Sequence, residues 1–249
     1  MKTRRELLDE FVERLRFAAG GDLESIVLYG SAAHDGFHEG YSDLNLLCTM
    51  KRLTRANMAK LSAPVRWWSV EHGEHPPLFF TVQELQSSSD VFAIELLDIK
   101  TSHKVLFGED VVRNIEVPLN LHRIELEHEL RTLLLKLRNH YLFAHGDDDG
   151  LRGVLAKSVS GALTLLRHAV FAIEGKMPGS NREALPRAAQ LLGFEQSALE
   201  SVLQLRHSGD QPMSSEDLVR IYENYVLAIM GAIDRVDQLA PTEQWQRVR

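Results

Sequence analysis

The sequence predicts an α+β protein, with a mixed-sheet domain over residues 1–113 followed by an all-helical bundle over residues 114–249. Three observations carry this prediction. Short apolar runs of strand length alternate with helical patterns in the first part of the chain. Strand patterns then stop, at a boundary placed near residues 108–118. The remaining residues carry three long apolar stripes at helical spacing, which favours a bundle of antiparallel helices.

In the first domain, apolar residues recur on one face over residues 4–17, which predicts a helix that ends at Gly20-Gly21. The run SIVLY at residues 25–29 predicts a buried strand, and SDLNLLCT at residues 42–49 predicts the next one. Further strands are expected at residues 65–70, 78–81 and 104–107, the last at a sheet edge, and helices at residues 54–61 and 91–100.

In the second domain, the three long stripes predict three long helices that bury apolar faces against one another. Two shorter helices are expected between the second and third stripes. The stripes cover residues 126–141, 155–170 and 218–236, and the shorter helices residues 182–192 and 197–206.

Composition excludes several classes of function. The 28 Lys and Arg against 35 Asp and Glu give a net charge of −7, and the two halves of the chain carry −4 and −3. Neither half is basic enough to favour a nucleic-acid partner. The single cysteine, Cys48, excludes a disulfide framework and a multi-cysteine zinc site. No run of about 18 apolar residues occurs, and the first residues are amphipathic, so a cytoplasmic protein without a membrane partner is expected.

A candidate site follows the first predicted strand. That strand ends in Gly30-Ser31, eleven residues follow, and the second strand opens with Asp43-Leu44-Asn45. Gly30 lacks a Cβ, so its backbone could approach a phosphate closely. Ser31 offers a hydroxyl and a backbone N–H where a helical turn could begin, a position that favours anions.

Asp43 and Asn45 share one face of the second strand because side chains alternate with a period of two. Their oxygen atoms suit a hard cation such as Mg²⁺ or Mn²⁺. A cation that bridges triphosphate oxygens would lower the cost of the charge that develops during nucleotidyl transfer. These residues could therefore hold a phosphate and a divalent cation together, as a site for a nucleoside triphosphate (NTP) requires.

These residues resemble the signature of the nucleotidyltransferases of the DNA polymerase β superfamily. That signature is an apolar residue, Gly-Ser or Gly-Gly, a gap of about ten residues, and Asp-apolar-Asp/Glu-apolar. Here Tyr29-Gly30-Ser31 and Asp43-Leu44-Asn45-Leu46 fill it with one departure, at Asn45. Residues 95–110 are similar to the end of such domains in bacterial proteins, and residues 126–142 to the helical domain that follows. The resemblance implies transfer of a nucleoside monophosphate from an NTP to an unidentified acceptor.

The sequence departs from the family pattern at Asn45. The family uses two carboxylates on this strand and a third on a later strand, whereas the amide of Asn45 contributes an oxygen ligand but no charge. Glu71 is the candidate in sequence order for the third carboxylate, and Glu71 and Glu95 are the two candidates for the general base. The alternative is a catalytically degenerate nucleotidyltransferase fold that serves as a nucleotide-binding or protein-interaction module, dimerising through its bundle.

The resemblance also implies that the helical domain selects the acceptor, a small molecule as in the aminoglycoside nucleotidyltransferases. Two other patterns resemble functional sites, a zinc site and a nuclease motif, but a structural role explains each of them better. His72-Gly73-Glu74-His75 lacks a second ligand pair for zinc, so a polar loop is expected. The pair Arg123 and His128 resembles a HEPN-type nuclease motif, but an i,i+4 pair between Glu127 and Arg131 on a charged helix face is the expectation.

Overall fold

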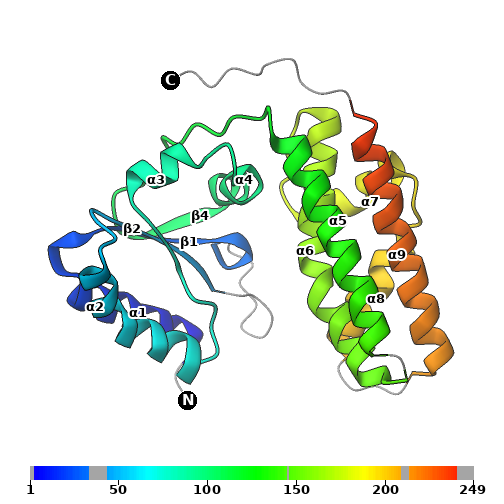
Figure 1. Ribbon diagram of the computed structural model, residues 1–249, viewed down its shortest axis with the longest axis horizontal. Coiled ribbons are helices and arrows are strands. Elements are labelled where there is room, and N and C mark those ends of the chain that lie inside the picture. The colour runs from blue at the N-terminus through cyan, green and yellow to red at the C-terminus, as the bar shows by residue number, and fades with distance from the viewer. Residues whose placement is uncertain (1–2, 34–43, 145, 209–212, 240–249) are drawn as a thin grey trace. The chain divides into compact units, whose positions relative to one another are not determined.

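A computed structural model describes residues 3–33, 44–144, 146–208 and 213–239. The chain divides into two compact units, Met1–Pro118 and Leu119–Arg249, of which the first contains the sheet and the second is helical (Figure 1). The predicted fold class, an α+β domain followed by a helical bundle, is confirmed.

The sheet of the first unit has four strands in the order β3-β2-β1-β4. β1 pairs antiparallel with β2 and with β4, whereas β2 and β3 are parallel, so the sheet is mixed. β4 is an edge strand, as predicted. The strands are β1 (Leu23–Tyr29), β2 (Asn45–Met50), β3 (Leu78–Phe80) and β4 (His103–Gly108).

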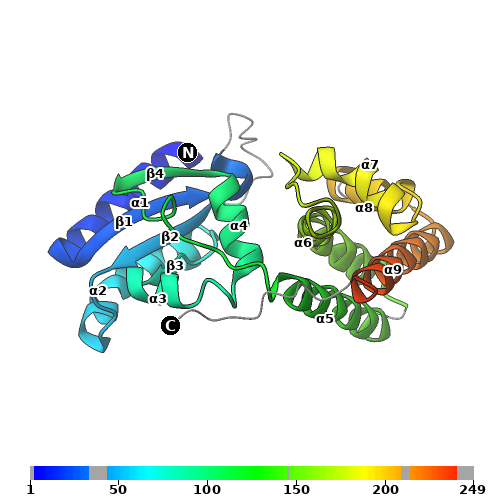
Figure 2. The ribbon, with the colours of Figure 1, turned by 90° about the horizontal axis from the view of Figure 1, so that it is seen from above.

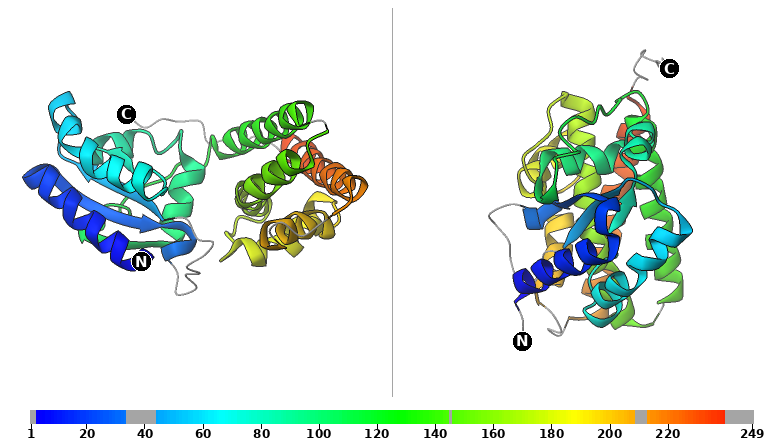
Figure 3. Two further views of the ribbon diagram at one scale, coloured as in Figure 1. Left: turned by 90° about the horizontal axis from the view of Figure 1, so that it is seen from below. Right: turned by 90° about the vertical axis from the view of Figure 1, so that its left-hand side faces the viewer.

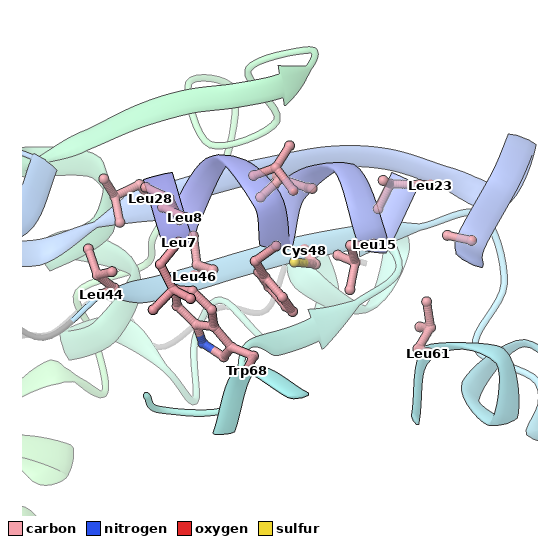
Figure 4. Close-up of a cluster of buried hydrophobic side chains, with 14 of the residues drawn as sticks. Leu7, Leu8, Leu15, Leu23, Leu28, Leu44, Leu46, Cys48, Leu61 and Trp68 are labelled. Atoms are coloured by element: carbon pink, nitrogen blue, oxygen red, sulfur yellow. The ribbon is translucent and has the colours of Figure 1, made fainter. Parts of the chain in front are cut away.

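Helices α1 (Arg4–Ala19) and α2 (Arg55–Arg66) cover one face of the sheet (Figure 3, left). α1 begins at Thr3, whose side chain forms a capping box with Glu6. The apolar side chains of both helices pack against alternate residues of β1 and β2 to form one closed core (Figure 4). Cys48 is fully buried in this core.

The strand predicted at residues 65–70 is wrong. α2 continues without a break into a π-helical turn, Trp67–Glu71. Its buried residues Leu61, Pro64 and Trp68 are spaced by three and four positions, which is the spacing of one helix face. Trp68 is fully buried, and its ring stacks on Phe11 of α1 at 4.5 Å between centroids. A short apolar run fits a strand or a helix equally well, and here packing against α1 selects the helix.

The opposite face of the sheet is covered by α3 (Val82–Ser87), α4 (Ala93–Thr101) and the segment that follows β4 (Figure 2). Helix α3 was not predicted, although Thr81 and Glu84 form a capping box whose pattern is visible in the sequence. A second core lies on this face, built from the residues Val27, Leu47, Leu85, Leu96, Ile99, Val112 and Ile115.

The second unit contains all five predicted helices. The stripes predicted for α6 and α9 are buried, and α6 packs against α5, α7, α8 and α9. In α5, Leu126, Leu130 and Leu137 of the predicted stripe are buried, whereas Tyr141 is half-buried and Leu134 is buried in place of the half-buried Leu133. Among the described helices, α6 alone is long and apolar enough to cross a membrane by length and composition. More than half of its most apolar stretch is buried inside the bundle, as in the core helix of a globular protein. The helices are α5 (His122–Phe143), α6 (Asp148–Glu174), α7 (Asn181–Leu192), α8 (Ser197–Ser208) and α9 (Ser215–Asp237).

Candidate functional site

The candidate site is built around the turn at Gly30, where β1 ends and a short 3-10 helix, η2 (Gly30–Ala33), begins. Gly30 has φ +78°, in the left-handed region that favours glycine. A Cβ built at this position would lie 3.4 Å from Nδ2 of Asn45, which is ordinary contact. Glycine is therefore required here by the backbone angle more than by lack of space.

Two reciprocal hydrogen bonds hold Gly30. Its N–H donates to the carbonyl of Ser102 at 3.1 Å, and the hydroxyl of Ser102 donates to the carbonyl of Gly30, also at 3.1 Å. Ser102 is buried at the C-terminal end of α4, immediately before β4. The turn after β1 is thus fixed to the junction between α4 and β4.

A row of polar side chains crosses the sheet beside this turn. Tyr29 lies directly opposite Asn45 on β2 and directly opposite His103 on β4. Directly opposite residues in antiparallel strands share a face, so the three side chains lie on the face that α4 covers. All three are half-buried. Leu44 belongs to the core on the other face, as the predicted alternation along this strand requires.

Two predicted residues of the site lie outside the described part of the chain. They are Asp43 and, because only its backbone is described, the side chain of Ser31. Among the described residues, no group of three or more His, Cys, Asp or Glu is arranged to hold a metal ion. The oxygen donors of Asn45 and of the acids on α4 are nonetheless of the type that Mg²⁺ and Mn²⁺ prefer.

The acids Glu95 and Asp98 of α4 lie close enough to Tyr29 to affect its titration. Burial, and then the negative charges of Glu95 and Asp98, raise the pKa of Tyr29 to about 12. The phenol therefore stays protonated at neutral pH and can donate a hydrogen bond. α4 thus brings carboxylates to the same face as Asn45, at the end of β1 that leads into Gly30.

Of these residues, the sequence predicts a role for Glu95 as a candidate acid, but none for Asp98 or Tyr29. A usable signal is present in the sequence, because Glu95 and Asp98 are three residues apart beside the buried Leu96 and Ile99. That spacing places both acids on one flank of a helix.

Glu71 lies in a different layer of the unit. It ends the π-helical turn that continues α2, it is exposed, and Trp68 of the same turn packs into the core on the α1 side of the sheet. Asn45 projects from the opposite face. The geometry therefore brings Glu95, and not Glu71, to the side of the sheet that carries Asn45; a role for Glu71 as ligand or base remains a prediction.

His103 has an acidic partner that sequence reasoning missed. Its Nε2 lies 3.1 Å from Oδ1 of Asp110, which also accepts the N–H groups of Val112 and Arg113. Partial burial opposes ionisation of Asp110, but the His103 hydrogen bond, these two backbone N–H groups and the charge of His103 together lower its pKa. The pair fastens the segment after β4 to the polar row.

The polar segment at residues 72–75 and the charged helix face around Glu127 both make the kind of contacts that stabilise a fold. Glu74 forms a bidentate ion pair with Arg4 at 2.7 Å, and the carbonyl of His75 accepts a hydrogen bond from the Trp68 indole. The expected pair between Glu127 and Arg131 is formed at 2.8 Å, and His128 is exposed.

Among the comparisons with known proteins, the comparison with solved structures is the informative one. No protein-family model matches the sequence, and neither does any curated protein. The structure is similar to that of spectinomycin adenyltransferase AAD(9) from Enterococcus faecialis, solved with ATP and spectinomycin. The TM-score is 0.61 at 17% sequence identity, over 95% of this chain and 100% of the other. The two proteins share a fold. The predicted architecture, an α+β domain followed by a helical domain, is therefore confirmed, and both units take part in the likeness.

Proposed function

We propose that the protein transfers a nucleoside monophosphate from an NTP to a small-molecule acceptor. The observation that carries the proposal is the turn at Gly30, held at positive φ beside Asn45, at the place where the sequence resembles the nucleotidyltransferase signature. The similar adenyltransferase, whose structure contains ATP and spectinomycin, supports the same class of reaction. The net charge of −7 disfavours a nucleic-acid acceptor.

In this proposal the backbone N–H of Ser31 donates to the β- and γ-phosphates, and Gly30, which has no Cβ, lets the phosphates approach the turn closely. Asp43 anchors Mg²⁺ or Mn²⁺, and Asn45 adds a neutral oxygen ligand. The cation, when bound, supplies charge neutralisation at the phosphate oxygens. The acceptor hydroxyl attacks the α-phosphorus, the bond to the β-phosphate oxygen breaks, and pyrophosphate leaves.

Glu95 is the better of the two candidates for the general base that takes the proton of the acceptor hydroxyl. Its charge reaches Tyr29, the residue before Gly30, whereas Glu71 lies in the layer of α2. A general base must come within hydrogen-bond reach of the proton it removes, which favours the acid on the face of Asn45.

The second candidate function is a nucleotide-binding module without catalysis. The neutral side chain of Asn45, where the family has a carboxylate, favours it. Loss of one charge from a metal site weakens the site more than loss of one neutral ligand would.

One experiment separates the two. The purified protein would be mixed with Mg²⁺ or Mn²⁺, each of the four α-labelled ribonucleoside triphosphates, and a panel of aminoglycosides and spectinomycin. We expect labelled acceptor and unlabelled pyrophosphate from the wild type, loss of both products in Asp43→Asn, and no change in Asp9→Asn, the same substitution at an exposed position of α1. Nucleotide binding without transfer would favour the non-catalytic module. No binding and no transfer would contradict both.

A further inference from the structure

We infer that Ser102 is a positioning residue for the triphosphate: its hydroxyl sets the orientation of the peptide group between Gly30 and Ser31. This inference rests on the proposed function, because it assigns a purpose to a residue that touches the proposed phosphate site only through Gly30. Neither the family motif nor any local pattern in the sequence singles out Ser102.

Each backbone and side-chain polar group of Ser102 has a partner. Its N–H donates to the carbonyl of Asp98 at 3.1 Å, its carbonyl accepts the N–H of Gly30, and its hydroxyl donates to the carbonyl of Gly30. The residue is only 8% exposed. Ser102 therefore joins the end of α4 to the turn after β1, and its hydroxyl is committed to the Gly30 carbonyl.

The hydrogen bond to the Gly30 carbonyl has a consequence for the next residue. A trans peptide group is planar, with its C=O and N–H pointing in opposite directions. Holding the Gly30 carbonyl against the Ser102 hydroxyl therefore directs the N–H of Ser31 away from Ser102. This N–H is the group proposed to bind the β- and γ-phosphates.

The restraint matters because it acts on a glycine. Glycine has more backbone freedom to lose than any other residue, so an unrestrained Gly30 would have to be ordered when the nucleotide binds. A hydrogen bond that orders it beforehand shifts this cost from binding to folding. We therefore expect loss of the Ser102 hydroxyl to weaken triphosphate binding as well as to destabilise the protein.

Ser25 offers a matched control at the other end of the same strand. It is fully buried, and its hydroxyl donates to the backbone carbonyl of Glu109 at 2.7 Å. It pairs with Gly108, whereas Tyr29 next to Gly30 pairs with His103. Ser25→Ala therefore removes the same kind of buried hydrogen bond without affecting Gly30.

The test compares Ser102→Ala, Ser102→Thr and Ser25→Ala in the full chain. Urea unfolding would measure stability, and calorimetric titration with ATP and with AMP, each with Mg²⁺, would measure binding. We expect both alanine variants to lose similar stability. We expect only Ser102→Ala to raise the Kd for ATP, by about threefold to tenfold, as for the loss of one hydrogen bond. AMP lacks the β- and γ-phosphates, so its binding should not change, and Ser102→Thr should restore ATP binding.

If Ser102→Ala does not fold, Ser102→Thr and Ser102→Val are compared instead. Threonine and valine have the same shape, but only threonine carries the hydroxyl. Equal ATP affinities in this pair would overturn the inference, and so would equal weakening in Ser25→Ala. If the wild type binds no NTP, the proposed function fails and the inference fails with it. If the wild type binds ATP and Ser102→Ala binds it equally well, the inference alone fails.

Discussion

The two faces of the sheet differ in what they contain. The face under α1 and α2 is closed by apolar side chains, including the fully buried Phe11 and Trp68. The face under α4 has an apolar centre but ends in the half-buried row of Asn45, Tyr29 and His103, with acids from α4 beside it. Burial of apolar area stabilises the first face, whereas the polar end of the second keeps groups that can bind a ligand. Substitutions on the two faces should therefore affect different properties.

The largest expected effect on stability is on the apolar face. Trp68→Ala removes a fully buried ring that stacks on Phe11, so the free energy of unfolding should fall by about 3–5 kcal/mol. Urea unfolding measures this loss. Val70→Ala, in the same turn but 72% exposed, should change stability by less than about 0.5 kcal/mol. A small loss in Trp68→Ala would show that this face does not carry the stability of the unit.

The next effect concerns the turn at Gly30. Gly30→Ala forces a side chain into the left-handed region, which costs about 1–2 kcal/mol, and should lower nucleotide affinity and transfer tenfold or more because the turn moves. Gly193→Ala is the control: Gly193 has φ +75° at the end of α7, and a Cβ at this position would meet no described atom within 4 Å.

We expect the two glycine variants to lose similar stability. Nucleotide binding should be reduced in Gly30→Ala alone. Equal ATP affinities by calorimetric titration would contradict the placement of the phosphates at this turn.

Local patterns predicted the apolar face better than the polar end. The strand at residues 25–29 and Gly30 after it were found because an apolar run ends at a turn residue, and the core position of Leu44 followed from alternation. The helical turn at Trp67 was missed because a short apolar run fits both periods. The choice depended on α1, which lies far away in the sequence.

The partners of Gly30 and Tyr29 could not be read from local patterns at all. Ser102 is 72 residues from Gly30, and it reaches the turn only because β4 pairs with β1 in one particular register. The same register places His103 beside Tyr29. A sequence pattern predicts which residues face inward, but it does not fix strand order or register over such distances.

A smaller effect is expected at Asn45. Asn45→Asp adds a carboxylate to the face that holds Glu95 and Asp98, so Mg²⁺ or Mn²⁺ affinity should rise by about tenfold, and stability without metal should fall through repulsion. Calorimetric titration with the metal alone measures the first change. The control is Asn139→Asp, at an exposed position of α5. Unchanged or lower affinity would show that Asn45 does not face an ion site.

The smallest effect is expected at the pair of His103 and Asp110. The pKa of Asp110 is lower in the folded state than in the unfolded state, so its carboxylate stabilises the fold. This stability is fully present above the unfolded pKa of about 3.9, and it is lost as the pH falls through the lower folded pKa. Asp110→Asn should therefore be less stable than the wild type at pH 6, by less than about 1 kcal/mol for a partly exposed pair, and the difference should shrink below pH 4. Urea unfolding at several pH values measures it, with the exposed Glu109→Gln as control. A difference that does not depend on pH would mean that the charge of Asp110 does not hold the segment after β4 to the polar row.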